Sequence, residues 1–297
     1  MNILAIDIGG TAIKIGTLND KINFTAFEEL PTNANLGAQA LMETVRQAAG
    51  RFSGFSAIGV STAMQVDPQT GTITHATDTF PGYTGTRVKA ILEERFSVPV
   101  AVENDANAVA IAEGAFGAAR DYSTFLSLVY GTGIGGGLVL DGQLYRGSGF
   151  SAGEVGHMRL HAGGKRCNCG LLGCYEAYAS ARILTETASR QFGRPMDGRQ
   201  LCALLHGGDP LAKEVVDSWL QEVVWGLSSL IQIFDPPCVV IGGGIMEDPY
   251  MLPKIRELLP GELMESFRAV KVLQARMGNR AGMIGAAHLA AQLLATM

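Results

Sequence analysis

Two segments of the sequence share one pattern, in which an apolar run meets a glycine cluster and a second apolar run follows. The first segment has Ile3–Ile8, then Gly9-Gly10-Thr11, then Ile13–Leu18; the second has Thr124–Tyr130, a longer glycine-rich stretch, then Leu138–Leu140. Short apolar runs bounded by glycine predict strands joined by tight turns. Because alternating helical and strand patterns follow each segment, we predict an α/β protein of two similar halves with a cleft between them.

The length of 297 residues exceeds the usual size of one core, which favours two domains. Pattern alone places the N-terminal α/β domain at residues 1–117 and the C-terminal α/β domain at residues 118–297. Further strands are predicted at Phe24–Leu30, Ala57–Val60, Val98–Val102, Gln143–Tyr145, Val239–Ile241 and Val270–Leu273, and helices at Leu36–Ala49, Arg87–Phe96, Asn104–Phe116, Tyr175–Gln191, Leu211–Phe234 and from Ala281 onward.

Composition excludes several classes of protein. The net charge of −5 and the lack of a basic run argue against a nucleic-acid partner and against a membrane-surface partner. No apolar stretch approaches the ~20 residues that a spanning helix needs. The first residues lack the basic region and cleavage site of a signal peptide, so we expect a cytoplasmic protein.

The first glycine turn is suited to holding phosphate. Gly9 and Gly10 let backbone N–H groups approach phosphate oxygens, and Thr11 adds a hydroxyl donor. Asp7 would repel phosphate unless a cation intervened, so we predict that it holds Mg²⁺ or one of its waters. The alternative is an ordinary hairpin with a solvated Asp.

The second glycine run matches the dinucleotide pattern through Gly131, Gly133 and Gly136, but it leads into a strand, and a helix is required there. We therefore reject an NAD site and predict a second turn, Gly131-Thr132-Gly133, on a nucleotide's phosphate tail. A third run, with Gly243 and Gly244 after a strand, could accept adenine and ribose, although a plain strand-to-helix turn is equally consistent with it.

The candidate base lies where an apolar strand passes into a helix, at Glu103-Asn104-Asp105-Ala106-Asn107. A helix N-terminus favours the ionised form of Asp105, which could accept the proton of a sugar hydroxyl as that hydroxyl attacks a γ-phosphorus. Asn104 and Asn107 could contact neighbouring hydroxyls. The alternative is a helix cap, for which Asn and Asp are preferred.

Three cysteines fall within eight residues, at Cys167, Cys169 and Cys174, and His157 precedes them by ten. Three thiolates and one imidazole complete a closed tetrahedral zinc site, which is structural because it leaves no open position. His161 is a rival fourth ligand, and three free cysteines in a loop are the alternative.

Glu154 and Glu176 flank these ligands, so zinc binding would bring two carboxylates near each other. Carboxylates that face a binding site are good acceptors for adjacent sugar hydroxyls. Two exposed surface glutamates are the alternative.

Taken together, these motifs resemble the ROK (repressor, open reading frame, kinase) family of sugar kinases and sugar-responsive regulators. The matching segments, in family order, are DIGGT at 7–11, ENDAN at 103–107, GTGIGGG at 131–137, GEVGH at 153–157, CNCGLLGCYE at 167–176, IGGG at 241–244 and AGMIGAA at 281–287. The resemblance implies an actin-like ATPase fold of two ribonuclease H-like domains with a sugar–ATP cleft between them. It also implies that the final helix, about 281–297, packs back on the N-terminal domain, and that the protein forms a homodimer.

The resemblance also assigns roles to individual residues. It implies Asp105 as the general base, the glycine turns as phosphate sites, and a structural Zn²⁺ held by His157, Cys167, Cys169 and Cys174. The residues that it implies for sugar binding are Gly82, Asn104, Asp105, Glu154, His157 and Glu176.

Two departures from the family pattern affect these assignments. Ala12 stands where Lys commonly follows DIGGT, and the nearest lysine is Lys14, so no phosphate-binding lysine is assigned. In the segment that holds Gly82, Thr79 and Tyr83 stand where many glucokinase-like members have Asn and Trp, which weakens the transfer of glucose specificity.

The expected function is transfer of the γ-phosphoryl group of Mg·ATP to a hexose hydroxyl. The resemblance favours the C6 hydroxyl of glucose or of a related hexose such as N-acetylmannosamine. A sugar-sensing, non-catalytic ROK-type regulator is the alternative. The regulators carry a DNA-binding region before the sugar domain, and here the first strand begins at Ile3.

Overall fold

The structure is a computed structural model that describes residues 2–19 and 21–296, so Met1, Asp20 and Met297 lie outside the described part. The chain forms two compact units. The N-terminal unit comprises Met1–Gly117, Leu144–Ala152 and Asn279–Met297. The C-terminal unit comprises Ala118–Gln143 and Gly153–Gly278.

The N-terminal unit is built on a five-stranded sheet in the order β3-β2-β1-β4-β7. Strands β1 (Ile3–Ile8), β2 (Ala12–Leu18) and β3 (Phe24–Pro31) form an antiparallel meander, and β4 (Ala57–Thr62) runs parallel to β1. Strand β7 (Val100–Asn104) is parallel to β4. The mixed pattern follows from the connections, because tight turns join antiparallel neighbours and parallel neighbours need a crossover.

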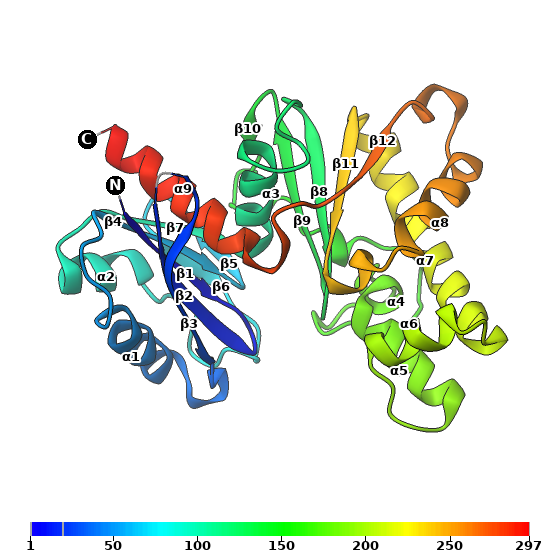
Figure 1. The fold of residues 1–297 in the computed structure, drawn as a ribbon, viewed down its shortest axis with the longest axis horizontal. Coiled ribbons are helices and arrows are strands. Elements are labelled where there is room, and N and C mark those ends of the chain that lie inside the picture. The colour runs from blue at the N-terminus through cyan, green and yellow to red at the C-terminus, as the bar shows by residue number, and fades with distance from the viewer. Residues whose placement is uncertain (1, 20, 297) are drawn as a thin grey trace. The chain divides into compact units, whose positions relative to one another are not determined.

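One face of this sheet packs on α1 (Ala38–Ala49) and α2 (Val88–Phe96), burying aliphatic side chains between them. The other face packs on α9 (Ala281–Ala295), which also contacts α3 (Asp105–Ala115) (Figure 1). Small residues allow this close approach. A Cβ on Gly59 would lie 2.1 Å from the carbonyl oxygen of Ala286, and a Cβ on Gly285 would lie 1.8 Å from that of Ala108.

The C-terminal unit repeats the sheet order as β10-β9-β8-β11-β12. The antiparallel pair is β8 (Phe125–Tyr130) and β9 (Ile134–Leu140), and β11 (Cys238–Gly242) is parallel to β8. The edge strands are β10 (Gln143–Leu144) and β12 (Lys271–Gln274), the latter parallel to β11.

The core of the C-terminal unit is organised by the long helix α7 (Pro210–Phe234), whose apolar side chains are buried among those of β8 and β11. Asp209 caps α7 by accepting from the N–H of Ala212, and Pro210 occupies the first turn, where a missing N–H is harmless. The other helices here are α4 (Glu176–Ala179), α5 (Ala181–Phe192), α6 (Gly198–His206) and α8 (Met251–Leu258).

Most predicted elements lie within a few residues of the observed ones, with three clear differences. Strand β9 begins at Ile134, not Leu138, so its glycines are strand residues; a Cβ on Gly136 would lie 2.7 Å from the carbonyl oxygen of Gly153. The helix predicted over Tyr175–Gln191 is interrupted at Ser180, whose extended backbone and hydroxyl start α5. The prediction missed the hairpin β5 (Gln65–Asp67) with β6 (Thr72–His75) and helix α6, and it gave no bounds for α8.

None of the helices in the described residues combines the length and the apolar composition that crossing a bilayer requires.

Candidate functional site

The first glycine turn joins β1 to β2 and is closed by a hydrogen bond from the N–H of Gly9 to the carbonyl of Ala12 (3.0 Å). Thr32, at the end of β3, holds the turn from outside. Its hydroxyl donates to the carbonyl of Gly9 (2.6 Å) and its N–H donates to the carbonyl of Thr11 (3.0 Å). No heavy atom outside its neighbours lies within 4 Å of a Cβ built on Gly10. The turn is thus both fixed and open, as a phosphate-binding turn requires.

Asp7 lies next to this turn, near the end of β1. Sheet register places it opposite Lys14 on β2 and Ser61 on β4, and the Ser61 hydroxyl donates to Asp7 Oδ1 (2.8 Å). Burial raises the pKa of Asp7, and the Ser61 hydroxyl and the Lys14 charge oppose that shift. A hard divalent cation beside this carboxylate would favour its ionised form, so the group fits the predicted magnesium role.

The predicted base, Asp105, is the first residue of α3 and is partly buried. Its Oδ1 accepts from the N–H of Ala106 (2.8 Å) and from Nδ2 of Asn104 (3.0 Å). Acceptance from an N-terminal N–H, together with the helix dipole, favours a carboxylate at this position. The structure therefore places an oriented acidic oxygen at the start of α3, as a proton acceptor needs.

Asn104 is the helix cap that the sequence offered as the alternative reading. Its Oδ1 accepts from the N–H groups of Ala106 and Asn107 (3.0 and 3.1 Å), and its Nδ2 also donates to the carbonyl of Met64 (3.1 Å). Because Oδ1 forms the cap and Nδ2 donates to Met64 and Asp105, direct contact of this amide with sugar stays a prediction. Asn107 is buried and donates through Nδ2 to Glu103 (3.0 Å), which is a structural role.

Glu103, two residues before Asp105 in the chain, is a buried carboxylate with 1% of its surface exposed. Its Oε1 accepts from the N–H of Asn104, and its Oε2 accepts from Nε and Nη2 of Arg146 (2.8 Å each). The sequence analysis missed Arg146. A single arginine in a glycine- and serine-rich segment was the available signal, but its partner lies 43 residues away along the chain.

We expect Arg146→Lys to lower the free energy of unfolding by about 1–2 kcal/mol, because an ammonium cannot reproduce the two-pronged guanidinium contact with a buried carboxylate. Chemical denaturation measures the change. Arg51 forms a comparable but exposed pair with Glu28, so Arg51→Lys should change stability by about 0.5 kcal/mol or less. Equal losses in the two variants would contradict a special role for the buried pair.

Gly82 belongs to the segment Thr77–Tyr83, which we call the sugar loop after the role that the family resemblance implies for Gly82. The rings of Phe80 and Tyr83 stack at 5.5 Å and are buried, and the Tyr83 hydroxyl shares a hydrogen bond with that of Thr62 (3.1 Å). Burial raises the pKa of Tyr83 to about 12, so this hydroxyl stays neutral. Gly82 has a φ of 70° and no neighbouring atom within 4 Å of a Cβ, which leaves its backbone accessible.

The second glycine turn, Gly131–Gly133, joins β8 to β9. The carbonyl of Gly131 accepts from the N–H of Ala181 at the start of α5 (3.0 Å), which fixes the turn. A Cβ on Gly133 would lie 2.6 Å from Oε2 of Glu176. The predicted phosphate turn and a predicted sugar-binding carboxylate are therefore in direct contact.

Glu154 and Glu176 lie on opposite sides of one imidazole. Oε2 of Glu154 is 3.8 Å from Nε2 of His157, and Oε1 of Glu176 is 3.9 Å from Nδ1. The Cys167 thiol donates to Oε1 of Glu176 (3.1 Å). Glu176 is mostly buried and Glu154 is exposed, so these two carboxylates are not equivalent surface groups.

The four predicted zinc ligands converge in one cluster, which we call the knot. One donor atom from each of His157, Cys167, Cys169 and Cys174 lies within 4.8 Å of the other three. Cys167 Sγ is 3.6 Å from His157 Nδ1, and Cys169 Sγ is 3.6 Å from Cys174 Sγ. A tetrahedral zinc ion has bonds of about 2.3 Å to sulfur and about 2.1 Å to nitrogen. These bonds require about 3.6 Å between a sulfur and a nitrogen ligand and about 3.8 Å between two sulfur ligands. The donor set therefore fits structural zinc.

The remaining chemistry of this knot agrees with that fit. His161, the rival ligand, is hydrogen-bonded through Nε2 to the carboxylate of Glu222 on α7 (2.7 Å) and lies outside this group of four. Burial raises the pKa of the Cys167 thiol, so a cation is needed to hold it as a thiolate. With Nδ1 of His157 facing the sulfur atoms, Nε2 is left on the side of Glu154.

The third glycine run follows β11. Gly243 has a φ of 110°, and a Cβ there would lie 2.1 Å from the carbonyl oxygen of Tyr130, so only glycine fits. A cavity of about 480 Å³ lies near this turn, since Ala275 in its wall donates its N–H to the carbonyl of Ile241, and a Cβ built on Gly242 would lie 3.1 Å from the Cβ of Ala275. The sequence analysis missed the cavity, which is lined by Glu247, Asp248, Pro249, Leu252, Pro253, Arg256, Gln274, Ala275, Arg276 and Gly278.

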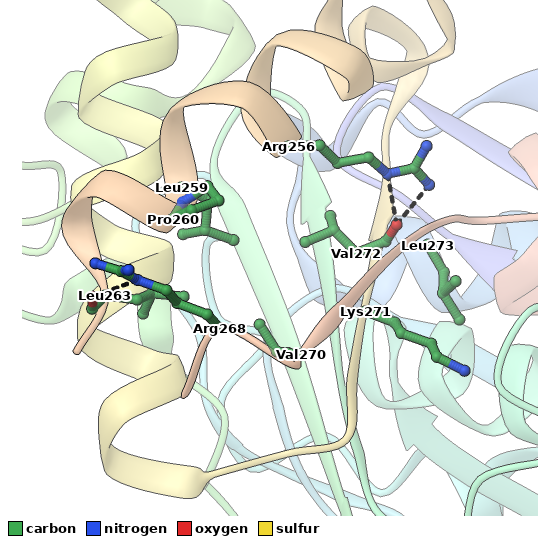
Figure 2. A pocket seen from close by; sticks show the side chains of 9 residues that line it. All are labelled: Arg256, Leu259, Pro260, Leu263, Arg268, Val270, Lys271, Val272 and Leu273. Carbon is green, nitrogen blue, oxygen red and sulfur yellow. Dashed lines mark hydrogen bonds between the residues drawn. The ribbon is translucent and has the colours of Figure 1, made fainter. Parts of the chain in front are cut away.

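A second cavity, of about 330 Å³, lies along the edge strand β12. Figure 2 shows Arg256 turned toward this strand, where Nε and Nη2 donate to the carbonyl of Val272 (3.0 and 2.6 Å). An arginine that covers a free strand carbonyl protects the edge of a sheet from pairing. We assign this cavity a structural role.

Comparison with known proteins identifies the family. The ROK family model matches residues 3–293. An N-acetyl-D-glucosamine kinase of Salmonella paratyphi A is 32% identical over 296 residues, covering 95% of this chain and 97% of that protein.

Two solved structures are similar over the whole fold. The ROK hexokinase of Thermus thermophilus is 36% identical with a TM-score of 0.84, covering 100% of both chains. The ROK family glucokinase of Streptomyces griseus, solved with glucose and AMPPNP, is 30% identical with a TM-score of 0.87, covering 98% of this chain and 100% of that one. The chain belongs to the ROK family, and its paired α/β units have the actin-like ATPase fold that the sequence predicted.

Proposed function

We propose that this protein is an ATP-dependent hexose kinase that transfers the γ-phosphoryl group of Mg·ATP to the C6 hydroxyl of glucose or of a related hexose, N-acetylhexosamines included. The observation that carries the proposal is the carboxylate of Asp105, oriented at the start of α3 by Asn104 and by the N–H of Ala106. An oxygen held in this way accepts a proton without reorganising.

In the proposed reaction, the sugar hydroxyl oxygen forms a bond to the γ-phosphorus while the bond from that phosphorus to the bridging oxygen breaks. The hydroxyl proton passes to Asp105, and ADP leaves with the electron pair of the broken bond. The turns at Gly9–Thr11 and Gly131–Gly133 offer N–H groups to the phosphates, and Asp7 would hold the magnesium ion that offsets their charge.

Sugar hydroxyls are proposed to bind Glu154, His157 and Glu176. The knot supports this assignment because Nδ1 of His157 faces the metal ligands and leaves Nε2 as a donor on the side of Glu154. Zinc supplies no chemistry here beyond fixing these groups. For adenosine we propose the turn at Gly243 and Gly244 together with the nearby cavity that Gln274, Ala275 and Arg276 help to line. A homodimer stays a prediction from the family resemblance.

The test is a coupled ADP-release assay with glucose, mannose, fructose, N-acetylglucosamine and N-acetylmannosamine, compared as kcat/KM. We expect turnover with one or more of them, and a loss of turnover with the 6-deoxy analogue of the best substrate. The matched 2-deoxy analogue, which keeps the C6 hydroxyl, should still be phosphorylated. ADP release that no sugar raises above the rate of ATP hydrolysis would overturn the proposal.

A further inference from the structure

Met64 has a backbone conformation that suits glycine better than methionine. It lies between β4 and β5 with a φ of 90°, a region that side chains with a Cβ rarely enter. Strain of this kind persists only where the surroundings enforce it, and it concentrates at functional sites. The position therefore raises the question of what the strained residue does.

The backbone of Met64 contacts a residue that orients the proposed base. Its carbonyl accepts from Nδ2 of Asn104 (3.1 Å), and the same nitrogen donates to Oδ1 of Asp105 (3.0 Å). This contact fixes the amide that orients the carboxylate. A glycine with the same φ would supply the same carbonyl without strain, so the backbone alone does not explain a methionine here.

The side chain of Met64 serves the sugar loop. Its Sδ accepts from the N–H of Thr77 (3.4 Å) and lies 3.8 Å from the Thr77 hydroxyl, which in turn is 2.7 Å from that of Thr79. Thr77 and Thr79 are exposed, whereas Phe80, the next residue, is anchored in the core. The thioether therefore holds the exposed part of the loop beside the residues that orient Asp105.

We propose that Met64 is a positioning residue for sugar binding, and that the chain keeps a strained conformation because only a side chain can hold Thr77–Thr79. This inference rests on the proposed hexose kinase function. The effects of the strain and of the thioether can therefore be measured separately at this position. Glycine removes both the strain and the thioether, whereas alanine removes the thioether alone.

Met64→Gly and Met64→Ala both lose a partly buried side chain that packs on the N-terminal core, so their unfolding temperatures are compared with each other. Met64→Gly should unfold about 2–4 °C above Met64→Ala, because only glycine also relieves the strain. Both variants should raise the KM for the best sugar about three- to ten-fold, the range expected for a lost hydrogen bond, while kcat and the KM for ATP stay within about two-fold. Steady-state kinetics and thermal unfolding of the full chain measure these quantities.

Ser97 provides the matched control because it is a non-glycine residue with a φ of 56° at the end of α2. Ser97→Gly should raise the unfolding temperature, but should leave every kinetic constant unchanged. A wild-type KM for sugar in Met64→Gly would overturn the proposal, and so would an equal rise in KM in Ser97→Gly.

Hydrogen exchange separates this inference from the proposed function. The N–H of Thr77 should exchange faster in both Met64 variants than in the wild type, and not in Ser97→Gly. If the wild type turns over no sugar, the kinase proposal fails and the exchange rate alone decides the role of Met64. Unchanged exchange at Thr77 would overturn that role whether or not the protein is a kinase.

Discussion

Asp105→Asn is expected to reduce kcat about 10³-fold, within the range of general-base contributions, while the protein stays folded and binds sugar. The two side chains have the same shape, and an amide oxygen can still accept from the N–H of Ala106 and from Asn104. An amide cannot take up the hydroxyl proton, so the loss should fall on kcat and leave sugar affinity within a few-fold. Single-turnover kinetics and equilibrium sugar titration measure the two effects separately.

The matched control is Asp197→Asn. Asp197 also lies at a helix start, where its carboxylate caps α6 by accepting from the N–H of Gln200 (2.8 Å). Asn caps helices about as well as Asp, so kcat and stability should change little in this variant. Turnover of Asp105→Asn within three-fold of the wild type would remove Asp105 from the role of base. A similar loss in Asp197→Asn would mean that a carboxylate at any helix start has the same effect.

The second large effect should come from Cys169→Ala. Cys169 is the exposed member of the knot, so its removal takes away a metal ligand without opening a cavity in the core. We expect the purified wild type to contain about one zinc ion per chain and the variant to contain much less. The unfolding temperature should fall by roughly 10 °C, because the binding energy of a structural metal is folding energy. Metal analysis and thermal unfolding give both values.

The same variant should weaken sugar binding, since His157 and Glu176 lose the support that fixes them. A rise in the KM for sugar of about ten-fold or more is expected, in line with the loss of supporting contacts at metal sites. Cys202→Ala is the control, because it removes a thiol outside the knot and should leave zinc content unchanged. Stoichiometric zinc in Cys169→Ala would contradict the ligand assignment.

Much of the fold could be predicted because its elements carry local signals. The turn Gly9–Thr11 between two apolar runs gave β1 exactly as observed and β2 within one residue, since turn chemistry and strand patterning agree there. Strand β9 was predicted too short because its glycines suggest a turn. The strand needs glycine because the backbone of Gly153 approaches it closely, and no local sequence pattern reveals that contact. The hairpin β5–β6 was missed because its strands are very short.

About as much of the candidate site as of the fold could be predicted from the sequence. The three cysteines were found from spacing, because metal chemistry restricts both residue type and separation, whereas the choice of His157 over His161 came from the family resemblance. The pairing of Glu103 with Arg146 was not found, since a buried ion pair between distant segments leaves no periodic trace. The strain at Met64 was likewise invisible, because it is enforced by contacts from Asn104 and Thr77 and not by the residue itself.

The packing of α9 on β1 and β4 has a consequence for biosynthesis. A ribosome that adds about 5–20 residues per second needs on the order of ten to forty seconds to proceed from the end of α3 to the end of α9. Throughout that interval, the part of the first sheet that α9 covers lacks this helix in the nascent chain. The first sheet to be translated is therefore among the last parts of the molecule to mature.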